Sequence, residues 1–202
     1  MNSNNNQEDK IRIAGFGWIN QPQQFSLEND RLTIITDPKT DFWQRTHYGF
    51  RNDNGHAFIQ EMDRDFTFAV KTDFKAVNQY DQCGIILYLD PDNWVKASVE
   101  SENQEYSRLG SVVTNLGYSD WASTDISPSV DSMWYRFSRR GPDFLIEHSS
   151  DGKDYRQMRI FHIHNTITIA RVGVYACSPV KAGFKAVFSN FKMGECIWTA
   201  EH

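Results

Sequence analysis

The chain has 202 residues, a formal net charge of −5 and an aromatic content of 14%. A chain of this length can bury about 70% of its potential surface, so it needs neither disulfides nor metal to build a core. The acidic balance argues against a nucleic-acid partner, which requires clustered basic charge. No apolar run approaches the roughly 20 residues that cross a bilayer. We therefore expect no nucleic-acid partner and no membrane partner.

The first ten residues are polar and rich in Asn, and we expect residues 1–10 to be disordered because their hydrophobicity is low. Residues 11–202 are expected to form a single domain. The chain shows no apolar segment of the kind that opens a secretory signal. Its three cysteines are odd in number and lack metal-binding spacing. These features predict a cytoplasmic location without a disulfide framework or a metal site.

Short runs of aromatic and β-branched residues, separated by turn residues, predict an all-β chain. No stretch sustains the apolar spacing of a helix. In chain order, the predicted strands are Arg31–Thr36, Phe66–Phe74, Gln82–Leu89, Trp94–Glu102, Arg108–Asn115, Trp134–Arg139, Phe144–Ser149, Ile167–Cys177 and Phe184–Phe191.

Two turns predict hairpins. The turn residues Asp90-Pro-Asp-Asn93 join two of these strands. The turn Gly141-Pro142 places Arg136 opposite Glu147 in the simplest register, and a slip by one residue would reverse the faces of both strands.

Several strands are apolar on one face and carry Trp, Tyr, Arg, Lys and Glu on the other. Such a face suits a sugar, because sugar C–H groups stack on aromatic rings and sugar hydroxyls need paired donors and acceptors. The alternative is that these side chains only cover the solvated face of an antiparallel sheet, and that the Trp residues cap the core. The candidate ligand-binding residues are Trp43, His47, Tyr88, Lys96, Glu100, Asn115, Asp120, Trp121, Arg136 and Tyr175.

The segment DFWQRTHYGF (residues 41–50), followed by DNGH (53–56), resembles the opening of a known family of domains of unknown function. That family includes a yeast protein named for regulation of enolase. Similar blocks follow in order at residues 92–100, 111–121, 149–152 and 172–179. The resemblance implies a concanavalin A-like jelly-roll β-sandwich of two antiparallel sheets, similar to lectin, glucanase and xylosidase-accessory domains. It implies glycan binding on the concave sheet as a common use of the fold, but a fold does not determine a function.

An enzyme of this class would need paired carboxylates. Glu100 and Glu102 alternate on one predicted strand, with Cα atoms about 6.5–7 Å apart, and Glu147 lies on another. These three would be the catalytic residues of a glycoside hydrolase. Exposed charges at the end of a hairpin explain the first two more simply. No nucleophile elbow and no dinucleotide motif is present, so we expect no cofactor.

Three functions remain. The preferred one is a non-catalytic, lectin-like domain that recognises a saccharide or sugar derivative on its concave sheet. The second, which the family resemblance implies, is a cytosolic regulatory protein that binds a metabolic enzyme such as enolase. The third is the glycoside hydrolase described above.

Overall fold

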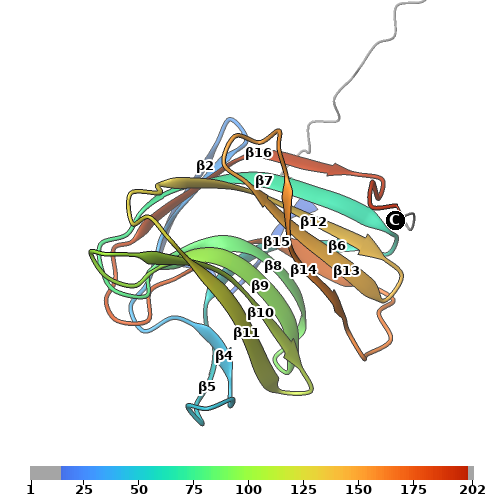
Figure 1. Cartoon of the computed structure of the whole chain (residues 1–202), viewed down its shortest axis with the longest axis horizontal. Helices are drawn as coiled ribbons and strands as arrows, with labels where there is room; N and C mark the ends of the chain where they lie inside the picture. Colours follow the sequence, from blue (N-terminus) through green and yellow to red (C-terminus); the bar gives the residue numbers. More distant parts are fainter. Residues whose placement is uncertain (1–14, 200–202) are drawn as a thin grey trace, which may run out of the picture.

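The computed structural model describes residues 15–199 and contains β-strands but no α-helix among them. Two seven-stranded antiparallel sheets face each other, and a two-stranded hairpin forms a third, small sheet (Figure 1). This is the predicted concanavalin A-like jelly-roll sandwich. No helix in the described part of the chain is long and apolar enough to cross a membrane. The segment predicted to be disordered, residues 1–10, lies outside the described residues.

The first sheet has the order β1-β6-β15-β8-β9-β10-β11. Its strands are β1 (Gly17–Ile19), β6 (His56–Met62), β8 (Gln82–Asp90), β9 (Asn93–Ser101), β10 (Ser107–Asn115), β11 (Tyr118–Ile126) and β15 (Ala170–Cys177). The second sheet has the order β14-β13-β12-β7-β16-β3-β2. Its strands are β2 (Gln24–Glu28), β3 (Arg31–Ile35), β7 (Phe66–Lys75), β12 (Ser132–Arg140), β13 (Asp143–Ser149), β14 (Arg156–His162) and β16 (Lys185–Gly194).

The main core lies between the two sheets, where alternate residues of each strand point inward. Val95 and Ala97 of β9 belong to this core together with Phe68 and Phe137 of the second sheet. A second, smaller apolar cluster lies on the outer face of the first sheet. Its members are Phe42, Trp43, Ala57, Ile59, Ile86, Tyr88, Trp94, Val112, Tyr175 and Cys177. The first sheet is therefore buried on both faces over its central strands.

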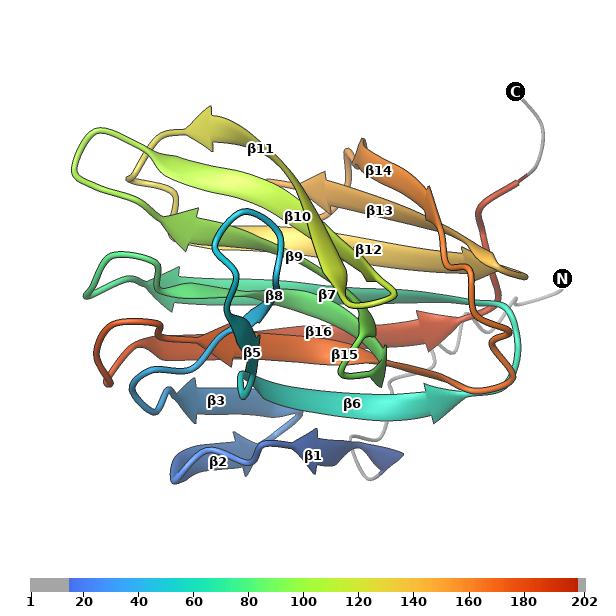
Figure 2. The ribbon, with the colours of Figure 1, turned by 90° about the horizontal axis from the view of Figure 1, so that it is seen from below.

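The hairpin of β4 (Phe42–Gln44) and β5 (Arg51–Asp53) covers this second cluster and crosses the outer face of the first sheet (Figure 2). Hydrogen bonds fix its position. The backbone N–H of Gln44 donates to Ser119 Oγ at 2.9 Å, and Arg45 donates to the Gly117 carbonyl at 2.6 Å. Gly117 has a φ of +79°, and a Cβ on it would collide with the Arg45 guanidinium. This glycine therefore serves both the β10–β11 turn and the docking of the hairpin.

Both predicted hairpins are confirmed. β8 pairs with β9 through the predicted turn, and Arg136 pairs with Glu147 between β12 and β13. Among residues 15–199 the sequence analysis missed seven strands, and three of them, β6, β11 and β14, have seven or more residues. β11 and β14 are rich in polar residues and largely exposed, so they lack the apolar alternation on which the prediction depended. β6 is mostly buried and was missed for a different reason, since its inner and outer faces are both covered.

Candidate functional site

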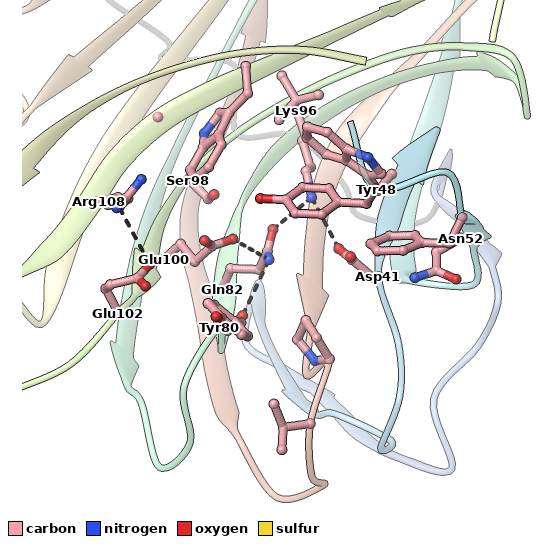
Figure 3. A pocket seen from close by; sticks show the side chains of 17 residues that line it. Asp41, Tyr48, Asn52, Tyr80, Gln82, Lys96, Ser98, Glu100, Glu102 and Arg108 are labelled. Atoms are coloured by element: carbon pink, nitrogen blue, oxygen red, sulfur yellow. Dashed lines mark hydrogen bonds and ion pairs between the residues drawn. The ribbon is translucent and has the colours of Figure 1, made fainter. Parts of the chain in front are cut away.

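A pocket of about 500 Å³ opens between the β4–β5 hairpin and the outer face of the first sheet. We call it the hairpin pocket (Figure 3). Strands β8 to β11 form its floor and one side, the hairpin forms another side, and two residues after β15 close the end. The residues that line it are Asp41, Trp43, Tyr48, Phe50, Asn52, Tyr80, Gln82, Lys96, Ser98, Glu100, Glu102, Arg108, Gly110, Val112, Trp121, Pro179 and Val180.

A chain of polar contacts runs along the floor of the hairpin pocket. Lys96 is only 4% exposed, and its ammonium group lies 3.3 Å from Asp41 Oδ1 and donates to Gln82 Oε1 at 2.8 Å. The amide of Gln82 in turn donates to Glu100 Oε2 at 2.7 Å. Figure 3 shows these contacts as one continuous series. A buried ammonium group is tolerated only when it is paired in this way.

The two glutamates of β9 differ in environment although they are two residues apart. Burial raises the pKa of Glu100 from 4.5 to about 7, against the opposing effect of Lys96. The carboxylate of Glu102 lies 3.4 Å from the guanidinium of Arg108. The hairpin pocket thus holds one carboxyl group that exchanges a proton near neutral pH beside one that is paired with a cation.

Aromatic rings form the opposite wall. Trp43 and Trp121 meet edge to face, with ring centroids 6.5 Å apart. Tyr48 and Phe50 stack on each other at 5.5 Å, and they are 56% and 45% exposed. Trp43 is only 9% exposed, so Tyr48, Phe50 and Trp121 present most of the accessible ring surface. Such surface is suited to the apolar face of a ligand.

Five of the predicted residues line the hairpin pocket: Trp43, Lys96, Glu100, Trp121 and the candidate acid Glu102. Two more lie in the apolar cluster next to it. Tyr175 is fully buried and donates to Gln82 Oε1 at 3.0 Å, and Tyr88 donates to Asp53 at 2.8 Å. These two tyrosines therefore support the site and do not line it.

Arg136 and Glu147 lie on the second sheet, far from the group with which they were predicted. Two short hydrogen bonds of 2.6 and 2.7 Å join them to each other. The prediction that Arg136 and Trp121 contribute to one binding site is therefore wrong. Arg136 lies on β12 of the second sheet, whereas Trp121 lies on β11 of the first. For the same reason Glu147 cannot share a cleft with Glu100 and Glu102.

Three other predicted residues lie outside the hairpin pocket. Asp120 pairs with Arg159 at 2.7 Å, Asn115 donates to the His162 carbonyl at 3.3 Å, and His47 lies at the exposed end of the β4–β5 hairpin. Asp120 and Asn115 thus link the first sheet to β14 and the segment after it.

The sequence analysis missed several residues that line the hairpin pocket, among them Asp41, Gln82 and Arg108. One signal could have found the first two. Lys96 stands in the middle of an apolar strand, and a lysine at such a position requires a carboxylate or amide partner. The exposed rings of Tyr48 and Phe50 carried no such signal.

Comparison with known proteins gives relatives along almost the whole chain. The family described as "Protein of unknown function (DUF1349)" matches residues 18–196. The "Regulation of enolase protein 1" of Saccharomyces cerevisiae is 34% identical over 185 residues, which are 92% of each chain. A solved structure of a functionally unknown protein from Saccharomyces cerevisiae has a TM-score of 0.87 at 31% identity and covers 93% of this chain and 100% of that one.

More distant structures share the fold alone. The GH43 BlXynB protein of Bacillus licheniformis has a TM-score of 0.69 at 16% identity, and the match covers 92% of this chain but 37% of that one. At this identity the likeness supports the sandwich architecture and carries no information on activity. By contrast, the family match covers residues 18–196, and the yeast relative is 34% identical over 92% of the chain. The chain therefore belongs to the DUF1349 family of proteins of unknown function.

Proposed function

We propose that this protein is a non-catalytic carbohydrate-binding protein and that the hairpin pocket holds a saccharide or sugar derivative. The observation that carries the proposal is that an aromatic surface and a hydrogen-bonding surface line the same pocket. The exposed rings of Tyr48 and Phe50 and the partly exposed ring of Trp121 lie on one side. The hydrogen-bonding groups of Gln82 and Glu100 lie on the other.

The dimensions and chemistry of the hairpin pocket support this proposal. Its volume of about 500 Å³ lies within the range of roughly 300–1,000 Å³ of small-molecule sites. The side chains of Asn52 on the hairpin and of Ser98, Glu102 and Arg108 on the sheet add further donors and acceptors. A sugar ring requires both surfaces at once, because its hydroxyls must be satisfied while its C–H face is covered.

A thermal-shift screen with mono- and oligosaccharides and sugar phosphates tests the proposal. A ligand present at 100 times its dissociation constant stabilises the fold by about 2.7 kcal/mol. We expect at least one saccharide class to raise the melting temperature and to bind in calorimetry without being cleaved. Failure of every class would contradict carbohydrate binding. Hydrolysis of a bound oligosaccharide would contradict the non-catalytic assignment and point to Glu100 and Glu102.

A second function is supported by an apolar surface that shares Tyr48 and Phe50 with the hairpin pocket and extends beyond it. Tyr48 and Phe50 at the β4–β5 hairpin and Leu116 and Tyr118 at the β10–β11 turn are exposed, and Arg45 bridges the two turns by stacking on Tyr118 and bonding to Gly117. Clustered exposed apolar side chains mark protein-binding surfaces. With the name of the 34% identical yeast relative, they support a cytoplasmic regulatory protein that binds enolase.

Calorimetry with purified enolase separates the two functions. The double variant Leu116→Ser and Tyr118→Ser changes the turn but no residue that lines the hairpin pocket. The regulatory function predicts that this variant loses enolase binding and keeps any saccharide binding. Absence of enolase binding by the unmodified protein would contradict this second function and leave the first one standing.

A further inference from the structure

The charged groups that line the hairpin pocket are unequal in number. Three carboxyl groups, those of Asp41, Glu100 and Glu102, face two cationic groups, those of Lys96 and Arg108. Asp41 pairs with Lys96 at 3.3 Å, and Glu102 pairs with Arg108 at 3.4 Å. The carboxyl group of Glu100 remains, and its hydrogen-bond partner is the neutral amide of Gln82.

The surroundings of Glu100 leave its charge without direct compensation. The ammonium of Lys96 is held by Asp41 and by the opposite end of the Gln82 amide. The neighbouring hydroxyls of Tyr80 and Tyr175 stay neutral, because burial raises the pKa of each above its ordinary value of 10. A positive group supplied by a ligand would therefore meet a carboxyl group that has no ion-pair partner of its own, and burying the two together avoids the cost of an unpaired charge.

The aromatic wall provides a second attraction for a cation. Within the hairpin pocket the guanidinium of Arg108 already lies 5.2 Å from the centre of the Trp121 ring, and the ammonium of Lys96 lies 5.6 Å from that of Tyr175. Among residues 15–199, no Lys or Arg group lies over the rings of Trp43, Tyr48 or Phe50. Electron-rich ring faces attract ammonium groups, most strongly where water is excluded.

We propose that the hairpin pocket prefers a saccharide that carries a protonated amine, with the Glu100 carboxylate binding the ammonium group while the aromatic wall covers the sugar ring. The proposal rests on the carbohydrate-binding function and adds the chemical class of the ligand. Glu100 would select amine-bearing saccharides over neutral ones, and Tyr48, Phe50 and Trp121 would contact the sugar ring.

Three oligosaccharide series with the same β-1,4 linkage test the preference: oligomers of glucosamine, of N-acetylglucosamine and of glucose. We expect calorimetry at pH 6.5 to show that the glucosamine series binds about tenfold or more tightly than the glucose series, since one charge-assisted hydrogen bond has that magnitude. The variant Glu100→Gln should bind the two series within about threefold of each other. The matched control Glu105→Gln, at an exposed position outside the pocket, should keep the full preference.

The pH dependence of the unmodified protein gives a second readout that needs no variant. Since the pKa of Glu100 is about 7, the ionised fraction of its carboxyl group grows between pH 5.5 and 6.5, and affinity for the glucosamine series should rise over this range. The charged groups around Glu100, namely Asp41, Lys96, Glu102 and Arg108, form two internal pairs. Affinity for the glucose series should change little over the same range.

The outcomes separate the two proposals. Equal binding of the glucosamine and glucose series overturns the amine preference and leaves carbohydrate binding in place. An amine preference that survives Glu100→Gln, or that does not grow with pH, overturns the assignment to Glu100. Failure of all three series while another saccharide class binds also overturns the amine preference. Failure of every saccharide overturns both proposals.

Discussion

The ring of Trp43 meets the ring of Trp121 at an interplanar angle of 84°, with the centroids 6.5 Å apart. Trp43 belongs to the β4–β5 hairpin and Trp121 to β11, the edge strand of the first sheet. The contact joins two segments nearly eighty residues apart in the chain and closes one wall of the hairpin pocket. The hairpin pocket therefore exists only when the hairpin is docked on the sheet.

Replacing Trp121 tests the aromatic wall. We expect Trp121→Ala to weaken saccharide binding by roughly 1–3 kcal/mol, because a partly exposed ring in a binding site contributes chiefly to ligand contact. Calorimetric titration measures the loss. The matched control is Trp134→Ala on β12 of the second sheet, which should leave affinity unchanged. Equal losses in both variants would contradict the placement of the ligand.

Gly110 allows the Trp121 ring to lie against β10. A Cβ on Gly110 would lie 2.8 Å from Trp121 Nε1, so Gly110→Ala should displace the ring and weaken saccharide binding severalfold. Tryptophan fluorescence should report a changed environment. The control is Gly194→Ala, since a Cβ there has no neighbour within 4 Å. Unchanged affinity in Gly110→Ala would show that the position of the ring does not matter.

The buried pair of Lys96 and Asp41 should stabilise the floor of the hairpin pocket. Lys96→Met removes the cation, leaves Asp41 without its ion-pair partner and removes one of the two donors to Gln82 Oε1. We expect a loss of about 3 kcal/mol or more in the free energy of unfolding, measured by urea denaturation. The partly exposed pair of Lys71 and Asp73 gives the comparison, because Lys71→Met should cost about 1 kcal/mol or less. Similar small losses in both variants would contradict the structural role of Lys96.

Glu100 should make stability depend on pH. Burial raises its pKa from 4.5 to about 7, so between these values the folded chain binds a proton more tightly than the unfolded chain. The free energy of unfolding should therefore fall as the pH rises from 4.5 to 7, and the contribution is lost above pH 7. At 1.36 kcal/mol for each pKa unit, the total is roughly 3 kcal/mol.

The variant Glu100→Gln isolates this contribution. Urea denaturation at pH 5 and pH 8 should show a smaller decrease for the variant than for the unmodified protein. Any decrease that remains in the variant comes from other groups, including Asp53, whose pKa burial also raises. Identical decreases in the two proteins would show that Glu100 titrates normally.

Local periodicity predicted much of the fold correctly. Lys96 and Glu100, predicted for the polar face of their strand, line the hairpin pocket, and the alternate residues Val95 and Ala97 of β9 lie in the main core. The Gly141-Pro142 turn gave the register of Arg136 and Glu147. Both inferences depend on neighbours within one strand or one hairpin, where the two-residue period and the turn fix the geometry.

The sheet to which each strand belongs could not be predicted in the same way. β11 and β12 are consecutive in the chain but lie in different sheets, so Arg136 was grouped with Trp121 although they lie on opposite sheets. The contact between Gln82 and Glu100 likewise depends on the pairing of β8 with β9. Asp41, Tyr48 and Phe50 line the hairpin pocket only because the β4–β5 hairpin docks on the first sheet. The alternation of apolar and polar residues along a strand does not encode where the hairpin docks.

The most direct test of ligand binding in the hairpin pocket follows the indole N–H signals of the six tryptophans by NMR during a saccharide titration. Our account predicts that the signals of Trp43 and Trp121 shift together and saturate with the calorimetric dissociation constant. The signals of Trp18 and Trp134 should stay in place, because neither residue lines the pocket. Shifts at Trp134 without shifts at Trp43 and Trp121, or binding that moves none of these signals, would contradict the site.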